Sequence, residues 1–512
     1  MTQRLLFDRR LLAISVLAGL AVRLWVAWQP VDVLSWRATA DDAYYYFKLA
    51  QHIGAGAGTT FDGINQTNGF HPLYALLLVP IFRYVGDDIA LGVHLALTLI
   101  ALVSVVTAWP IYLIGKSVHS SLAGAIGAMI HLLNPWVIIL TMTGVESAVY
   151  VFCFAWTVMA YVRWKTSLQS FRGIVPVGLL SGLTIMARSE GIMLLVGIIF
   201  DLIVEHWRRS GSMLMLIVLV GGLSFVVCFP WMFWSISLFG TPFQISSSAI
   251  MLHNYANVPK DVFEAVKWYL GRISWFIPRY LYKLILFNFT AVVGLAIFYF
   301  PGFRLKLNFF SLNRLFFLFV TISAISVYYN TILLHQQHWY FNALVLIFTL
   351  LGSVVISDGL SRIKSESLLH RYRKSFSLLV LFVLCVFFVI YWQRGLYPGQ
   401  KFAYENGIHI AGSYLRGERL GATDSGIVGF FCRCVMVNLD GVMNNAAVEY
   451  YRTYGYNRES IFRFALSQDV SYIWSGEPFT SSEVRTVRRV QFLNGVWYQI
   501  EKAENSTGYS DD

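Results

Sequence analysis

Long apolar runs, separated by short polar segments, recur along residues 1–395 of the 512-residue chain. A helix needs about 20 apolar residues to cross a hydrocarbon core of about 30 Å, because it rises only about 1.5 Å per residue. The pattern therefore predicts a polytopic α-helical membrane protein, in which each helix satisfies its own backbone hydrogen bonds. The candidate spans are 11–28, 88–114, 121–141, 147–163, 174–187, 191–206, 213–239, 283–301, 315–334, 341–358 and 376–393.

The composition agrees with this prediction. Hydrophobic residues make up 57% of the chain and charged residues only 13%, against about 25% charged in soluble domains. These proportions exclude a cytosolic enzyme, a disordered chain and a disulfide scaffold. The cysteines show no metal-binding spacing.

The basic residues predict how the spans are oriented. The net charge is +11, and basic loops lie between apolar runs at 163–172, 208–209, 304–314 and 362–374. If the short run Phe70–Tyr84 lies along the membrane surface instead of crossing, all these loops share the side of the Arg-rich N-terminus, as the positive-inside rule requires. We therefore predict about eleven spans, a cytoplasmic N-terminus and an extracytoplasmic C-terminus. The membrane explains the positive charge, so no nucleic-acid partner is expected.

This topology divides the chain into two predicted domains. Residues 1–393 form a transmembrane domain with outer loops at 30–87 and 240–282, and residues 394–512 form an extracytoplasmic domain. The loop 240–282 is amphipathic and basic, which suits contact with phospholipid head groups. Strand-like and helix-like segments alternate in the tail, which predicts a small α/β domain.

Two adjacent aspartates, Asp41 and Asp42, open a short amphipathic helix in the first outer loop. Adjacent carboxylates repel each other, so at least one needs a cation, a hydrogen-bond donor or a raised pKa. One interpretation is helix capping, with Asp41 as the N-cap and Asp42 in the first turn. The other is a carboxylate base at a helix start just outside the membrane. The residues by themselves leave both open.

A second polar segment carries Arg188 and Glu190 between two short apolar runs. The first run, of about 14 residues, reaches only about 21 Å, so the charged tip would lie below the outer membrane surface. A mutual salt bridge is one explanation of the pair. A guanidinium beneath an outer cavity would also suit a lipid-linked phosphate.

A third polar segment contains His335, His338 and Tyr340. Two histidines three residues apart are a weak metal signal, and Tyr340 is typical of a membrane-interface belt. Facing the outer side, this segment would equally suit a sugar or a phosphate. Further polar candidates on the same side are His71 and Glu146.

Residues 41–82 (DDAYYYFKLAQHIGAGAGTTFDGINQTNGFHPLYALLLVPIF) resemble the signature of polytopic GT-C glycosyltransferases. That family is similar to protein O-mannosyltransferases, lipid A aminoarabinose transferases and related bacterial polyprenyl-phosphate sugar transferases. The resemblance, over roughly the first 395 residues, implies Asp41 as catalytic base, Asp42 as its acidic neighbour and Arg188 at the family's basic outer position. Many relatives carry an Arg-Tyr-like motif where this chain has 335–340, and the tail carries no information on the acceptor.

The resemblance implies inverting transfer of a sugar from a polyprenyl-phosphate donor to a glycan, lipid or protein acceptor, at the outer face of a bacterial plasma membrane. Asp41 would take the proton of the acceptor hydroxyl as that oxygen attacks the anomeric carbon. The leaving phosphate needs a compensating cation, which need not be a metal. A divalent metal, if bound, would be held by Asp41 and Asp42, and no other cofactor is expected. Residues assigned to donor or substrate binding are Arg188, Glu190, His335, His338, Tyr340, His71 and Glu146.

Two other classes of function fit the same composition. A membrane transporter or flippase of a lipid-linked or polar solute would use similar charges, but would favour internal repeats or helices broken at the midplane. A non-catalytic binding or scaffold protein would use the tail and would tolerate the loss of Asp41.

Overall fold

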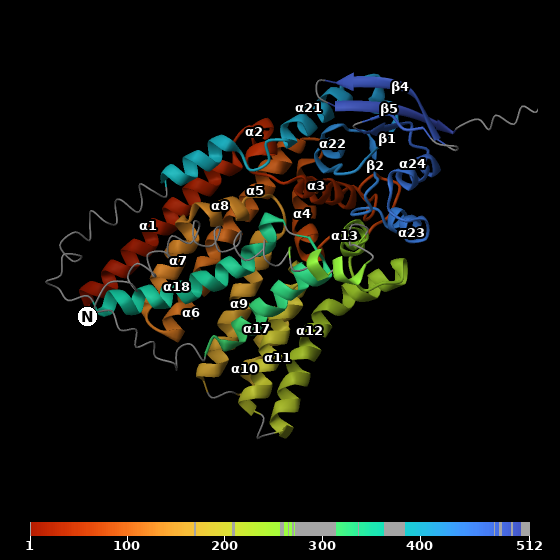
Figure 1. Cartoon of the computed structure of the whole chain (residues 1–512). Coiled ribbons are helices and arrows are strands. Elements are labelled where there is room, and N and C mark those ends of the chain that lie inside the picture. The colour runs from red at the N-terminus through yellow and green to blue at the C-terminus, as the bar shows by residue number, and fades with distance from the viewer. Residues whose placement is uncertain are drawn as a thin grey trace, which may run out of the picture.

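The computed structural model describes most of the chain as helices, with a small sheet at one end of the bundle (Figure 1). The predicted fold class, a helical membrane domain followed by a small C-terminal α/β domain, is confirmed. The described residues are 2–167, 170–206, 210–255, 261–264, 266–268, 271, 314–335, 337–362, 385–475, 477–480, 484–492 and 495–502.

The bundle follows the predicted apolar runs closely. Its helices are α1 (Thr2–Ala27), α2 (Val31–Arg37), α3 (Asp41–Gly54), α4 (Pro72–Val85), α5 (Ile89–Val106), α6 (Ala108–Val118), α7 (Ser121–Leu133), α8 (Pro135–Thr141), α9 (Ser147–Thr166), α10 (Phe171–Ala187), α11 (Gly191–His206), α12 (Ser210–Phe239), α13 (Ile245–Tyr255), α17 (Phe316–Val327), the π-helix η1 (Tyr328–Ile332), the 3₁₀-helix η2 (His338–Phe341) and α18 (Asn342–Arg362). A further helical segment covers 385–394.

Within the described residues, four helical segments are long and apolar enough to cross a membrane: Ile89–Val118, Ser147–Thr166, Met213–Phe239 and His338–Gly359. Two bent pairs raise this to as many as six, with bends of 110° between α1 and α2 and 60° between α7 and α8. The helices α4 and α10 are apolar but shorter. The count of about eleven spans stays a prediction, because 283–301 and half of 376–393 lie outside the described residues.

Arg23 binds the carbonyl end of α7, at the bend between α7 and α8. Its buried guanidinium donates to Ser104 Oγ at 3.0 Å and to the carbonyls of Gly19, Leu132 and His131 at 3.0, 2.8 and 3.2 Å. Leu132 and His131 lie in the last turn of α7, whose carbonyls have no partner inside the helix. The charged Arg23, which lies in the first apolar run, therefore supplies hydrogen-bond donors to the free carbonyl groups at the end of α7.

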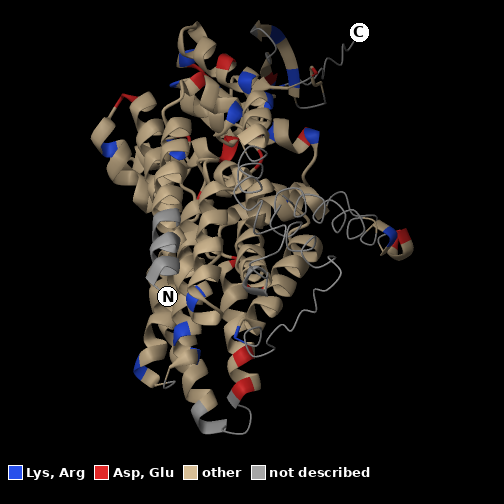
Figure 2. Cartoon of the chain, turned by 90° about the vertical axis from the view of Figure 1, so that its left-hand side faces the viewer, with Lys and Arg blue, Asp and Glu red and all other residues tan. Residues whose placement is uncertain are grey.

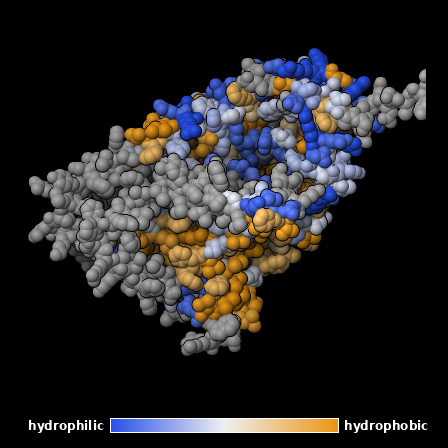
Figure 3. Space-filling view, in the orientation of Figure 1, coloured by the Kyte–Doolittle hydropathy of each residue, from blue (hydrophilic) through white to orange (hydrophobic). Residues whose placement is uncertain are grey.

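The distribution of polarity matches a membrane bundle. Most charged residues lie toward the two ends of the bundle and on the C-terminal domain (Figure 2). The surface over the helices α10 to α12 is hydrophobic, whereas the C-terminal domain is largely hydrophilic (Figure 3). On α12, Leu214, Val218 and Phe233 remain 61%, 63% and 63% exposed, as expected of side chains that face lipid.

The C-terminal domain contains a five-stranded sheet of order β2-β1-β3-β5-β4. Its strands are β1 (Arg419–Ala422), β2 (Val435–Asn438), β3 (Tyr472–Trp474), β4 (Val484–Phe492) and β5 (Gly495–Lys502), and its helices are α21 (Gln400–Ala411), η3 (Tyr414–Gly417), α22 (Gly426–Phe431), α23 (Asn445–Tyr454) and α24 (Arg458–Ser467). β1 pairs in parallel with β2 and β3, while β5 pairs antiparallel with β3 and β4. Because β1 and β2 are parallel, the loops that follow them, with Asp424 and Asp440, lie at one edge of the sheet.

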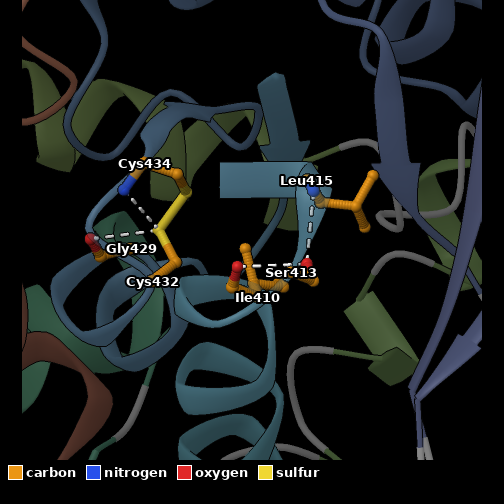
Figure 4. Close-up of a disulfide and its surroundings, with 6 residues drawn as sticks. All are labelled: Ile410, Ser413, Leu415, Gly429, Cys432 and Cys434. Carbon is orange, nitrogen blue, oxygen red and sulfur yellow. Dashed lines mark hydrogen bonds between the residues drawn. A yellow bond between two sulfur atoms is a disulfide. The ribbon is translucent and has the colours of Figure 1, made fainter. Parts of the chain in front are cut away.

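The same domain contains a disulfide that the sequence did not indicate. Cys432 and Cys434, directly after α22, are joined, and the Cys434 N–H donates to Cys432 Sγ at 3.2 Å (Figure 4). Nearby, Ser413 caps η3 by accepting from the Leu415 N–H at 3.2 Å.

Candidate functional site

The helix α3 presents the two aspartates to different neighbours. It begins at Asp41, and its N-cap is Ala40, which makes no side-chain cap. The interpretation of Asp41 as the N-cap of its own helix is therefore wrong. Consecutive helical residues project about 100° apart, so the side chains of Asp41 and Asp42 point in different directions, and both are partly exposed.

Asp41 faces the C-terminal domain. Its two carboxylate oxygens accept the backbone N–H groups of Gly426 at 3.0 Å and Ile427 at 2.8 Å, at the start of α22. One turn later in α3, the Tyr45 hydroxyl accepts from the Ser425 N–H at 2.7 Å. A Cβ added at Gly426 would lie 2.3 Å from the Asp41 carbonyl oxygen, so only glycine permits this approach. Asp41 is thus an anchor of the C-terminal domain on the first outer loop.

Aromatic packing reinforces this anchor. The ring of Phe431 lies 5.3 Å from that of Tyr44, and the ring of Phe430 lies 6.0 Å from that of Phe47. All four side chains belong to one buried core that continues into the helical bundle. The C-terminal domain therefore forms one wall of the region around α3.

Asp42 lies on the other side of α3, toward the bundle. Partial burial raises the pKa of Asp42 to about 7, the negative charges of Glu146, Asp424 and Asp440 add to the effect, and the positive charge of Arg188 opposes it. Among the described residues, its carboxylate has no hydrogen-bond partner. Asp42 is therefore a carboxylate that is open to a ligand and titrates near neutral pH.

Burial also raises the pKa of Asp41 well above its usual range. The negative charge of Asp424 adds to this effect, and the N–H donor of Ile427 opposes it. The pKa values of both aspartates are therefore raised, and the two residues differ in that, within the part of the chain that the structure describes, only the Asp41 carboxylate accepts hydrogen bonds.

Arg188 is the centre of a buried polar cluster. Its Nε lies 3.0 and 3.2 Å from the two carboxylate oxygens of Glu190, and its second terminal nitrogen lies 2.5 Å from one of them. Its other terminal nitrogen is paired with Glu146, and the Tyr329 hydroxyl donates to Glu190. The guanidinium stacks over the ring of Tyr340 at 4.7 Å. The cluster holds one positive and two negative charges, and all three charged residues are buried.

The predicted salt bridge between Arg188 and Glu190 is therefore present, but within a larger set of contacts. Residues distant in sequence, at 146, 188–190, 329 and 340, converge beside α3. Tyr46, one turn after Asp42, accepts from the His71 N–H at 3.2 Å and lies close to Glu146.

The three candidate histidines occupy different places. His71 Nδ1 is hydrogen-bonded to Gln244 Nε2 at 2.9 Å. His335 places its ring 5.8 Å from that of Tyr340, next to the cluster, whereas His338 packs edge-on against Trp136 of α8 at 5.8 Å. Across the described part of the chain, no group of three His, Cys, Asp or Glu side chains is placed to hold a metal ion. We therefore derive no chemical step through a metal.

Sequence reasoning missed three contributors to the site. Tyr329 lies in the π-helix η1, a distortion that is frequent at functional sites. Asp424 follows β1 with a φ of 46° and acts electrostatically on Asp42. Asp440 accepts from the Asp424 N–H at 2.9 Å. The loops that contain Asp424 and Asp440 follow two parallel strands, β1 and β2, and therefore meet at one edge of the sheet. A sequence-based prediction that these strands are parallel would have placed the two aspartates together.

The architecture is that of GT-C membrane transferases. The structure matches ArnT from Cupriavidus metallidurans bound to undecaprenyl phosphate with a TM-score of 0.55 and 13% identity, over 94% of this chain and 97% of that chain. It also matches the oligosaccharyltransferase AglB from Archaeoglobus fulgidus, in complex with an inhibitory peptide and a dolichol-phosphate, with a TM-score of 0.52 and 16% identity, over 91% of this chain and 69% of that chain. At this identity the matches establish the fold, and they confirm an integral membrane protein.

A more specific likeness comes from the sequence. The family model of dolichyl-phosphate-mannose-protein mannosyltransferases matches residues 71–234, which include Glu146, Arg188 and Glu190. No curated protein matches the sequence. The resemblance to GT-C polyprenyl-phosphate sugar transferases, predicted from the first outer loop, is confirmed.

Proposed function

We propose that this protein is a membrane glycosyltransferase that moves a sugar from a polyprenyl-phosphate donor to an acceptor hydroxyl. The family match and the two GT-C structures, which carry undecaprenyl phosphate and a dolichol-phosphate, support this function. The observation that carries the proposal is the convergence of Asp42 with Glu146, Arg188, Glu190 and Tyr340 beside α3 in this fold.

The geometry favours Asp42 over Asp41 as the catalytic base. Both oxygens of Asp41 already accept backbone N–H groups of α22, whereas Asp42 is open and its pKa is about 7. A general base is most effective when its pKa is near the working pH. Asp41 as the base, expected from the family resemblance, stays an alternative that mutation can test.

The proposed step is a single displacement. Asp42 accepts the proton of the acceptor hydroxyl while that oxygen bonds to the anomeric carbon. The bond from the anomeric carbon to the phosphate oxygen breaks, and its electron pair leaves with the polyprenyl monophosphate. The configuration at the anomeric carbon inverts, and no covalent glycosyl-enzyme forms.

Arg188 is the proposed source of positive charge for the leaving phosphate. Since Glu146 and Glu190 already neutralise it, a phosphate would have to exchange with one of these carboxylates. A guanidinium suits such an exchange, because its planar donors can bind a carboxylate and a phosphate side by side. Tyr340 beneath it would hold the guanidinium plane in place.

The assignment of the base is tested with Asp42→Asn and Asp41→Asn in reconstituted protein. The readout is release of polyprenyl phosphate from labelled polyprenyl-phosphate sugars, with membrane extract as the source of acceptors. Asp42→Asn should lower the rate at least about 100-fold, in the range of a general base, and Asp41→Asn should lower it less. Asp32→Asn, an exposed carboxylate in α2, is the matched control. The reverse order of effects would assign the base to Asp41, and no transfer by the wild type with any such donor would reject the function.

The C-terminal domain is proposed to lie outside the cytoplasm, at the end of the molecule where α3 and the polar cluster meet it. The disulfide between Cys432 and Cys434 supports this location, because disulfides persist in oxidising compartments and are rare in the cytosol. The division of the chain near residue 394 is likewise part of the proposal.

A further inference from the structure

A small apolar recess lies apart from the Arg188 cluster, where the first helices meet the segment 385–394. Its apolar lining includes Val26 of α1, Ile138 and Ile139 of α8, and Phe388. In Figure 1 the segment 385–394 runs beside α1 and reaches α2. The recess therefore opens between helices far apart in the sequence.

One charged side chain, Arg37 at the end of α2, lines this recess. Its guanidinium lies 4.5 Å from the ring centroid of Trp36 and 5.8 Å from that of Trp392. Its Nε is buried and has no hydrogen-bond partner, and no ion pair of Arg37 is formed within the described residues. A partly buried guanidinium without an acceptor is costly, so an anionic ligand would satisfy it.

The surrounding residues place Arg37 at the membrane surface. Trp25 and Trp28, on the same end of α1, remain 47% and 53% exposed, and Trp25 packs on Trp392 at a ring distance of 4.9 Å. Exposed tryptophans of this kind are enriched where a membrane helix meets the lipid head groups. Arg37 therefore lies at the depth of lipid phosphates, with the apolar recess beside it.

Backbone contacts show what this arrangement holds together. The Tyr397 N–H donates to the Trp36 carbonyl at 2.8 Å, and the Leu396 N–H donates to the Arg37 carbonyl at 3.2 Å. These bonds join α2, which directly precedes α3, to the segment that enters the C-terminal domain. A ligand on Arg37 would therefore stabilise the junction between the first outer loop and that domain.

We propose that Arg37 and the adjacent recess bind an anionic phospholipid of the surrounding bilayer. The lipid phosphate bonds to the guanidinium between Trp36 and Trp392, and an acyl chain lies across the mouth of the recess, along Val26, Ile139 and Phe388. The site is separate from the proposed donor site, and the inference does not depend on the proposed transfer reaction.

The test compares lipid binding and stability in purified, delipidated full-length protein. Phosphatidylglycerol or phosphatidylcholine is added in detergent, and bound lipid is counted by native mass spectrometry together with the thermal midpoint of unfolding. Phosphatidylglycerol should bind to the wild type and raise the midpoint, and Arg37→Gln should weaken that binding about tenfold. Arg37→Lys, which keeps the charge, should retain part of it. Arg83→Gln, an exposed arginine at the end of α4, is the matched control.

A second variant, Ile139→Trp, places a bulky ring at the mouth of the recess without removing the charge and should also weaken phosphatidylglycerol binding. Equal binding of phosphatidylglycerol to the wild type and Arg37→Gln would overturn the proposal. Tight binding of undecaprenyl phosphate at this site, without binding of phosphatidylglycerol, would also overturn it. The site would then bind the lipid carrier of the transfer reaction and not a phospholipid of the bilayer. A midpoint unchanged by phosphatidylglycerol in the wild type would also count against it.

Discussion

At the scale of single residues, the charge on Asp42 is set in part by the C-terminal domain. The proposed base must be ionised, so the transfer rate should rise with pH through a value near 7. Asp424→Asn removes one negative neighbour, which favours ionisation of Asp42 and should move this limb of the pH–rate profile to lower pH. The shift should be less than about one pH unit, because Asp424 is exposed and its charge is screened. Asp469→Asn, an exposed carboxylate elsewhere in the domain, should leave the profile unchanged.

The contacts of Arg188 decide how its replacement would act. Arg188→Ala leaves Glu146 and Glu190 buried without their cation, and breaking a buried ion pair in this way costs about 3–5 kcal/mol. A double variant with Glu190→Ala should recover only part of the stability, because Glu146 remains. Arg188→Lys should weaken use of the donor more than use of the acceptor, since lysine cannot make the two-pronged contact. Thermal unfolding and the Michaelis constants for both substrates measure these effects. Full recovery in the double variant, with unchanged donor use in Arg188→Lys, would assign Arg188 a structural role alone.

At the scale of elements, the junction between α3 and α22 couples the C-terminal domain to the site. Gly426→Ala would force a Cβ to 2.3 Å from the Asp41 carbonyl oxygen, so α22 must move away. The C-terminal domain should then be released faster by limited proteolysis, and turnover should fall. Gly417→Ala, where an added Cβ meets nothing within 4 Å, is the matched control. Identical proteolysis of both variants would show that the junction does not hold the domain.

At the scale of the whole molecule, the proposed topology places the two ends of the bundle in different compartments. In a variant that lacks the exposed Cys385, a cysteine at Thr453 of α23 should react with an impermeant thiol reagent in intact cells. A cysteine at Thr166, at the end of α9, should react only after the membrane is opened. Both positions are exposed in the structure. Labelling of Thr166→Cys from outside would reverse the proposed orientation.

The sequence by itself determined the helical membrane architecture, because apolar runs of membrane-spanning length have few other stable structures. The ends of α10 and α11 were predicted within a few residues, since Arg188 and Glu190 interrupt the apolar pattern there. The α/β character of the tail also followed from local periodicity. The likeness to GT-C transferases was visible in residues 41–82 and is confirmed by the fold.

Only the tertiary structure separated the roles of Asp41 and Asp42. The two are neighbours in the sequence, but the 100° turn between helical residues directs one to the N–H groups of Gly426 and Ile427 and the other toward Arg188. The partners lie about 150 to 390 positions away along the chain, where no local pattern specifies contact. Hydrophobic periodicity records which face of a helix is buried, whereas the identity of a buried polar partner depends on which distant segment packs there.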